Sequence, residues 1–198
     1  MFPLGNPLMP GARLPLHVFE ARYRALVEHS MATSAEFGVV LIERGSEVGG
    51  GDVRFDVGTL ARIEEVGRFP DGRYALSVIG TQRLRVESWR GDDPFPHAVV
   101  TVLDEPAARP GDAARREALV AAMGRVAGLA ASLGIAFDPA VPEGLIDAIW
   151  YAAAHAVTGP LDAHRVLAAD DLDVRFANLL DALEGTEVLL RHRLDEGR

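Results

Sequence analysis

The sequence predicts an α+β protein, with a β-rich N-terminal half that contains one helix and a C-terminal half that is a helical bundle. Three observations predict this fold class. Residues 57–63 and 83–89 alternate between apolar and polar side chains, which is typical of strands. From residue 112 onward, apolar residues recur every three or four positions, as in packed helices. Residues 106–110, with a proline at each end, are the candidate linker, so we expect domains at residues 1–106 and 107–198.

The overall composition limits the classes of partner. The chain has 198 residues, of which 48% are apolar and 25% charged, so it can bury a core. Its formal net charge of -9 gives an average field that repels nucleic acid and anionic membranes. Nucleic acid is therefore an unlikely partner by charge. The first ten residues lack the pattern of a secretory signal, and no apolar stretch is long enough for a membrane span, so we expect a cytoplasmic protein.

Two residue types are missing, and their absence excludes several kinds of site. The chain has no cysteine, which removes disulfides, thiolate metal ligands and cysteine nucleophiles. All 20 basic residues are arginines, so there is no lysine for a P-loop, a Schiff base or a Ser-Lys dyad. Three large classes of enzyme are thereby excluded.

Residues 15–30 predict an extended segment that leads into a helix. After Pro-Leu-His, the apolar residues Phe19, Tyr23, Leu26 and Val27 follow at steps of four, three and one. This spacing places them on one face of an amphipathic helix whose other face is charged. We therefore expect these side chains to be core residues.

A buried strand and a glycine-rich loop are expected next. The run at residues 37–42 is almost entirely apolar, which is typical of a buried strand. The glycines around Gly49 could hold an anion with their backbone N–H groups, but no lysine follows them and Asp52 would repel a phosphate. We interpret the segment as a mobile hairpin loop.

The rest of the first half predicts a compact sheet or a small barrel. Asp71-Gly72 is expected to form a two-residue hairpin turn, because both residues tolerate a positive φ. Gly80-Thr81 is expected to end the strand that returns from this turn. The expected strands are residues 57–63, 74–79, 83–89 and 98–103.

The second half predicts helices. The first begins at Asp112 and ends near Gly134, a residue typical of the position that follows a helix. Another begins near Pro142 and ends at Gly159-Pro160. In both helices the apolar residues form a stripe suited to burial in a bundle.

The last helix is expected to be the longest. Asp162 could cap a short turn before it, and Asp171 is its expected N-cap. Asp170, Asp171 and Asp173 could also suggest calcium, but the rest of an EF-hand loop is missing. Acidic residues at a helix start are favoured by the helix dipole, so we interpret them as capping residues.

Several motifs, in this order and spacing, resemble a known family. They are Pro-Leu-His-Val-Phe-Glu-Ala-Arg-Tyr-Arg at residues 15–24, Phe37-Gly38, Val-Gly-Thr-Leu-Ala at residues 57–61, Asp-Gly-Arg-Tyr at residues 71–74, and residues 80–86. The chain is similar to the N-terminal substrate-binding domain of Lon proteases and its stand-alone bacterial relatives. Ala21 departs from the family, which often has proline at this position.

The resemblance implies a PUA-like β pseudobarrel followed by a helical bundle. It also implies a module that keeps the recognition part of Lon protease without the ATPase and Ser-Lys peptidase domains. On this basis we expect a non-catalytic protein without a cofactor that binds unfolded or extended polypeptide. It could act as an adaptor for a protease or a chaperone.

Five residues in the best-matching motif are the candidate peptide-binding site: His17, Phe19, Glu20, Arg22 and Tyr23. In the functional interpretation they form part of a groove rim that contacts an extended peptide. The structural interpretation is simpler, because side chains at a strand-to-helix junction can cap the helix and lock its entry by hydrogen bonds.

No other motif indicates catalysis or a metal. There is no HExxH, no G-x-S-x-G and no carboxylate pair recognisable from the sequence, so we expect no catalytic residue and no metal ligand. His155 has no partner at metal-ligand spacing and is expected to be buried or at the edge of the core. RNA or nucleotide binding is the alternative function, because PUA-like folds often bind RNA and Arg83, Arg85 and Arg90 could share one rim.

Overall fold

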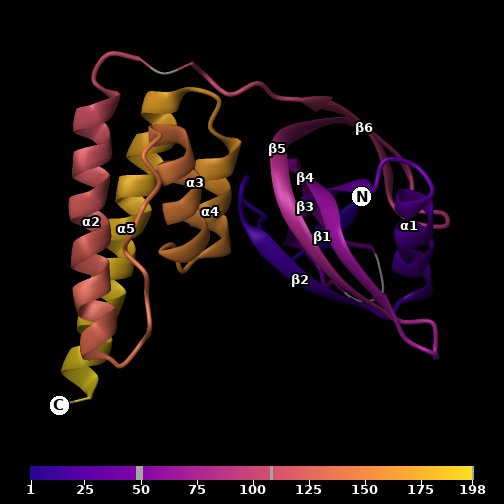
Figure 1. Cartoon of the computed structure of the whole chain (residues 1–198), viewed down its shortest axis with the longest axis horizontal. Helices are drawn as coiled ribbons and strands as arrows, with labels where there is room; N and C mark the ends of the chain where they lie inside the picture. Colours follow the sequence, from indigo (N-terminus) through magenta and orange to yellow (C-terminus); the bar gives the residue numbers. More distant parts are fainter. Residues whose placement is uncertain (48–50, 108, 198) are drawn as a thin grey trace. The chain divides into compact units, whose positions relative to one another are not determined.

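The computed structural model describes residues 1–47, 51–107 and 109–197, so the loop predicted around Gly49 lies outside the described residues. The chain forms two compact units, Met1–Asp104 and Glu105–Arg198. The first contains a sheet and one helix and the second only helices, which confirms the α+β class (Figure 1). Glu105, placed in the first domain by the sequence, belongs to the helical unit, where its carboxylate pairs with Arg175.

The sheet of the first unit is mixed, and β1, β2 and β6 each pair with one other described strand. Its strand order is β1-β3-β4-β5-β2, and β6 also pairs with β5. β1 runs parallel to β3, and the other pairs are antiparallel. The strands are β1 (Phe2–Leu4), β2 (Arg13–Val18), β3 (Glu36–Arg44), β4 (Val53–Arg68), β5 (Tyr74–Gly91) and β6 (His97–Val102). The PUA-like identity of this sheet stays a prediction.

The turn between β4 and β5 is longer than the two-residue turn that was predicted. Phe69 N–H donates to the Arg73 carbonyl at 2.9 Å, and Gly72 N–H donates to the Phe69 carbonyl at 2.9 Å. Pro70 has the fixed φ that suits the first central position of a type I turn, and Gly72 follows with φ at +83°. These preferences produce a three-residue loop instead of a two-residue one.

β5 continues through Gly80-Thr81, so the predicted strand break is wrong. The register between β4 and β5 shifts at this point, which is a β-bulge, and the Thr81 hydroxyl donates to the Leu60 carbonyl at 3.0 Å. A Cβ at Gly80 would lie 2.3 Å from the Met9 carbonyl oxygen. Glycine is needed here because another part of the backbone passes close to the strand, which bends without ending.

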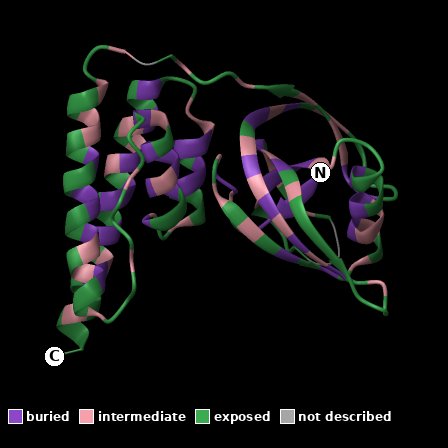
Figure 2. Cartoon of the chain, in the orientation of Figure 1, coloured by how far each residue is buried: buried purple, intermediate pink, exposed green. Residues whose placement is uncertain are grey.

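α1 (Ala21–Met31) packs on the concave side of the curved sheet (Figure 1). Tyr23, Leu26 and Val27 are buried, as predicted, and Figure 2 shows the buried face of this unit turned inward. Phe19 is 55% exposed, so its assignment to the core is wrong. The helix begins only at Ala21, and the helical period therefore does not extend back to Phe19.

The second unit has one more helix than the sequence predicted. Its helices are α2 (Asp112–Ser132), α3 (Leu145–His155), α4 (Pro160–Ala168) and α5 (Leu172–Glu196), and α2 lies beside α5 (Figure 1). The predicted short turn after Gly159 is α4, which has Pro160 in its first turn and no side-chain cap from Asp162. Asp171 is the N-cap of α5, as predicted, and accepts hydrogen bonds from Asp173 and Val174 N–H.

Arg175 is a fully buried charged side chain in the helical unit. Its Nε and Nη2 donate to the Ala169 carbonyl at 3.1 and 2.9 Å, and its guanidinium pairs with the Glu105 carboxylate. The guanidinium also lies 4.5 Å from the centre of the Trp150 ring. This one side chain thus joins α5 to α3 and to the start of the unit.

Candidate functional site

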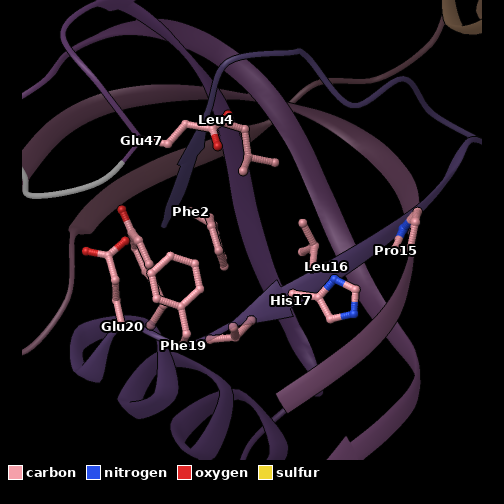
Figure 3. A pocket seen from close by; sticks show the side chains of 10 residues that line it. Phe2, Leu4, Pro15, Leu16, His17, Phe19, Glu20 and Glu47 are labelled. Carbon is pink, nitrogen blue, oxygen red and sulfur yellow. The ribbon is translucent and has the colours of Figure 1, made fainter. Parts of the chain in front are cut away.

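The candidate site is a pocket between β1 and β2, the first and last strands in the order β1-β3-β4-β5-β2. Its volume is about 180 Å³. β1 and β2 supply much of its wall, and each of these strands pairs with only one neighbour among the described strands. Figure 3 shows Pro15, Leu16 and His17 on one side of the pocket and Glu20 and Glu47 on the other. The full lining is Phe2, Leu4, Pro15, Leu16, His17, Val18, Phe19, Glu20, Tyr23 and Glu47.

The backbone of β2 presents hydrogen-bonding groups away from the sheet. Gly80 N–H donates to the Ala12 carbonyl at 2.9 Å, and the pairing with β5 stays in register through β2. Because backbone groups of successive residues point to opposite sides of a strand, those of Arg13, Pro15 and His17 point to the open side. Proline suits this edge, since its missing N–H breaks no bond to β5.

Tyr23 is enclosed in the wall of the pocket. Its ring stacks on Phe2 with the centroids 4.2 Å apart, and the Arg22 guanidinium lies 4.3 Å from the centre of the same ring. Burial raises the pKa of Tyr23 to about 12, an effect that the nearby Arg22 charge opposes. The hydroxyl therefore stays protonated at neutral pH. It is buried without a hydrogen-bond partner among the described residues.

Arg22 holds the rim of the pocket together. Its Nε donates to the Glu20 carboxylate at 3.1 Å, and its Nη2 donates to the Glu47 carbonyl at 3.1 Å. The Glu47 carboxylate accepts a hydrogen bond from Gly5 N–H. The start of α1, the segment after β3 and the segment after β1 are thus joined by one guanidinium and two glutamates.

A second hollow, of about 250 Å³, adjoins the first. The two hollows share His17, Val18 and Phe19, so the exposed Phe19 ring borders both. The turn between β4 and β5 supplies Phe69 and Arg73, and the start of β5 supplies Tyr74. Apolar and aromatic surface therefore continues past Phe19.

The structure brings the five candidate residues together, but in different roles. His17 and Phe19 are exposed, Glu20 lines the pocket, and Tyr23 forms part of its wall. Arg22 is not among the lining residues and instead ties the rim together, while no described side chain caps the start of α1 at Glu20. Their role in peptide binding stays a prediction.

The residues that line the two hollows but were not predicted as site residues include Phe2, Leu4, Glu47 and Phe69. Phe2 and Leu4 lie in a strand of three residues, which is too short to show a period of two. Glu47 and Phe69 lie in connecting segments and reach the site only through the fold. The sequence offered one hint of these residues: Phe2 and Leu4 are large apolar residues at the start of the chain.

Two further expectations need correction. Arg83 is buried, so it does not share an exposed rim with Arg85 and Arg90. His155 is exposed and not part of a core; its ring stacks on Tyr151 with centroids 4.4 Å apart.

Within the described ranges, no three His, Asp or Glu side chains gather as they would around a metal ion. No helix in these ranges is long and apolar enough to cross a membrane.

The chain matches the model of the ATP-dependent protease La (LON) substrate-binding domain over residues 1–185. It is 30% identical to Lon protease 2 of Herpetosiphon aurantiacus and 32% identical to Lon protease of Cytophaga hutchinsonii, over 107 and 100 residues. These segments cover 52% and 50% of this chain but only 13% and 12% of the two proteases.

Two solved structures resemble most of the chain. The crystal structure of a Lon N-terminal domain protein from Xanthomonas campestris has a TM-score of 0.66 and 28% identity, with 91% of this chain and 95% of that chain covered. The N-terminal domain of the Mycobacterium avium complex Lon protease has a TM-score of 0.65 and 18% identity, with 92% and 96% covered. The second likeness concerns the fold alone.

Proposed function

Because the chain belongs to the family of Lon substrate-binding domains, we propose that it binds unfolded or extended protein segments in the pocket between β1 and β2. Membership in the family makes the chain a substrate-binding module. We further propose that the module is non-catalytic and that its ligand is an extended polypeptide.

One observation carries this proposal: an apolar pocket lies beside a strand edge that has unpaired backbone groups. An extended segment can add to such an edge by main-chain hydrogen bonds, while alternate side chains enter adjoining pockets. The outward groups of β2 are the carbonyl of Pro15 and both backbone groups of Arg13 and of His17. Main-chain bonds do not depend on side-chain identity, which suits a module that binds many unfolded segments.

The side chains around this edge favour the same ligand. Leu16, Phe2 and Leu4 give the pocket an apolar lining, and Phe19 leaves more than half of its surface exposed. Exposed large aromatic side chains at the border of a pocket are typical of binding surfaces. An unfolded segment exposes apolar side chains that a folded protein buries, so it can fill both hollows.

The proposal also covers the module's compartment and partners. We propose that it works in the cytoplasm and delivers bound segments to a protease or a chaperone. Its fold needs no disulfide, because the chain has no cysteine.

The test compares two fluorescent peptides that have the same apolar sequence and no structure of their own. One is N-methylated at every residue, so that it cannot donate main-chain hydrogen bonds along either edge. The unmodified peptide should bind with saturable anisotropy, and the methylated peptide should bind at least about tenfold more weakly. Phe19→Ala should also weaken binding, while Val188→Ala, which removes an exposed apolar side chain in α5, should not.

Each outcome separates the proposal from its rivals. Equal affinity for both peptides would rule out pairing to the strand edge. Lack of binding to the unmodified peptide, together with binding to an RNA pool that falls steeply with salt, would replace the proposal with RNA recognition.

A further inference from the structure

We propose that the pocket between β1 and β2 selects segments that carry a lysine or arginine side chain and rejects acidic ones. This inference rests on the proposed function, since it names which extended segments the same pocket prefers. Three features of the described residues carry it: the charges on the rim, the aromatic wall and the buried hydroxyl of Tyr23.

The charged side chains that line the pocket are acidic. Glu20 and Glu47 are the two lining residues with a full charge, and both lie on the side opposite Pro15 (Figure 3). Arg22 neutralises part of this charge through its contact with Glu20 at 3.1 Å, but its guanidinium lies over Tyr23 and does not line the pocket. A ligand in the pocket therefore meets an excess of negative charge, which attracts a cation and repels a carboxylate.

The wall beside these carboxylates is aromatic. Phe2, Phe19 and Tyr23 all line the pocket, and Figure 3 shows the Phe19 ring on the same side as Glu20. The faces of aromatic rings attract ammonium and guanidinium groups. Phe2 and the Arg22 guanidinium already cover the two faces of the Tyr23 ring, so the exposed Phe19 ring is the part of this wall that a ligand cation can face.

The Tyr23 hydroxyl is a polar group that the fold leaves without a partner. Tyr23 is 3% exposed, and its hydroxyl has no hydrogen bond to any described residue. A buried polar group without a partner destabilises a protein, so a bound segment that supplied the missing hydrogen bond would gain affinity from it. The hydroxyl oxygen can accept a hydrogen bond from an ammonium, a guanidinium or a main-chain N–H of the bound segment.

The arrangement of apolar lining and carboxylates also suits a long basic side chain. The apolar stem of lysine or arginine can lie along Leu16 and Phe2, while its charged end reaches Glu20 and Glu47. A shorter neutral side chain would gain only the apolar part of this contact.

The test uses three fluorescent peptides that are identical except for one central lysine, glutamine or glutamate, at low ionic strength. The lysine peptide should bind about three- to tenfold more tightly than the glutamine peptide, and the glutamate peptide more weakly than both. In the double variant Glu20→Gln, Glu47→Gln the ratio between lysine and glutamate peptides should fall close to one. The double variant Glu65→Gln, Glu87→Gln changes the net charge equally at exposed positions outside both hollows and should keep the ratio.

The outcomes distinguish the two proposals. Measurable and equal binding of all three peptides, or tightest binding of the glutamate peptide, would overturn the selection for basic side chains and leave the proposed function standing. Lack of binding by all three would overturn the proposed function and this inference with it. If the ratio between the affinities for the lysine and glutamate peptides fell equally in both double variants, net charge and not this pocket would select the peptide.

Discussion

The ring of Phe2 stacks on the ring of Tyr23, with the centroids 4.2 Å apart and the planes 11° from parallel. Phe2 comes from the first strand and Tyr23 from the first helix, so the stack joins two segments that are separated by β2. It also forms part of the pocket wall. The stability of the first unit and the shape of its candidate site therefore depend on the same contact.

Phe2→Ala should destabilise the first unit by about 3 kcal/mol, because it removes a buried aromatic ring together with its stacking contact to Tyr23. Phe19→Ala is the matched control, since that ring is 55% exposed and its loss should change the free energy of unfolding by less than about 0.5 kcal/mol. Urea unfolding followed by Trp89 fluorescence measures both. Equal losses would show that Phe19 is a core residue after all.

Tyr23→Phe should separate stability from binding. The substitution keeps the ring and removes a buried hydroxyl that has no partner among the described residues, so the free energy of unfolding should stay the same or rise by about 1 kcal/mol. Peptide affinity should fall, because the hydroxyl is proposed to contact the bound segment. Clear destabilisation would mean that the hydroxyl has a partner in the fold.

High pH should destabilise the first unit, because it favours deprotonation of Tyr23. The folded protein holds the pKa of Tyr23 at about 12, above the value of about 10 expected in the unfolded chain. Stability is therefore unaffected below about pH 10 and falls as the pH rises from there towards 12, by about 3 kcal/mol in all. Urea unfolding between pH 9 and about 11.5 should show this fall in the wild type and a smaller one in Tyr23→Phe. Identical slopes would remove Tyr23 as the cause.

Gly58→Ala should be far more damaging than Gly67→Ala, although both glycines lie in β4. A Cβ at Gly58 would lie 2.1 Å from the Val39 carbonyl oxygen, whereas one at Gly67 would lie 3.8 Å from its nearest neighbour, the Ala75 carbonyl oxygen. We expect a loss of about 3 kcal/mol for the first and less than about 1 kcal/mol for the second. Similar melting temperatures for the two variants would contradict the strand pairing of β3 and β4.

Arg175→Met should destabilise the helical unit by about 3 kcal/mol, because it removes two donors to the Ala169 carbonyl and one partner of the Glu105 carboxylate. Arg165→Met, which breaks only exposed ion pairs, should cost less than about 0.5 kcal/mol. Thermal unfolding followed by Trp150 fluorescence compares them. Equal effects would show that the buried guanidinium contributes no more than an exposed one.

The sequence predicted the fold where the determining forces are local. The period of three and four placed Tyr23, Leu26 and Val27 in the core, and the acidic start of the last helix identified the Asp171 cap. It failed where distant segments meet. Gly80 looked like a strand break because nothing local shows that the Met9 carbonyl passes beside it.

The candidate site was predicted only in part, for the same reason. Residues 17–23 are contiguous, so one motif identified them together. Phe2 and Glu47 join them through the parallel pairing of β1 with β3 and through the contacts of Arg22, and both are long-range features of the fold. A pocket between two strand edges cannot be read from either strand alone.

Amide hydrogen exchange of His17, followed by NMR with and without an unstructured apolar peptide, tests the central claim most directly. The N–H of His17 points to the open side of β2, so it should exchange quickly in the free protein and become protected when the peptide adds to the edge. The amide of Leu16, which faces β5, serves as the control and should be protected in both states. Saturable peptide binding without protection of His17 would contradict pairing to this edge and place the binding site elsewhere on the chain.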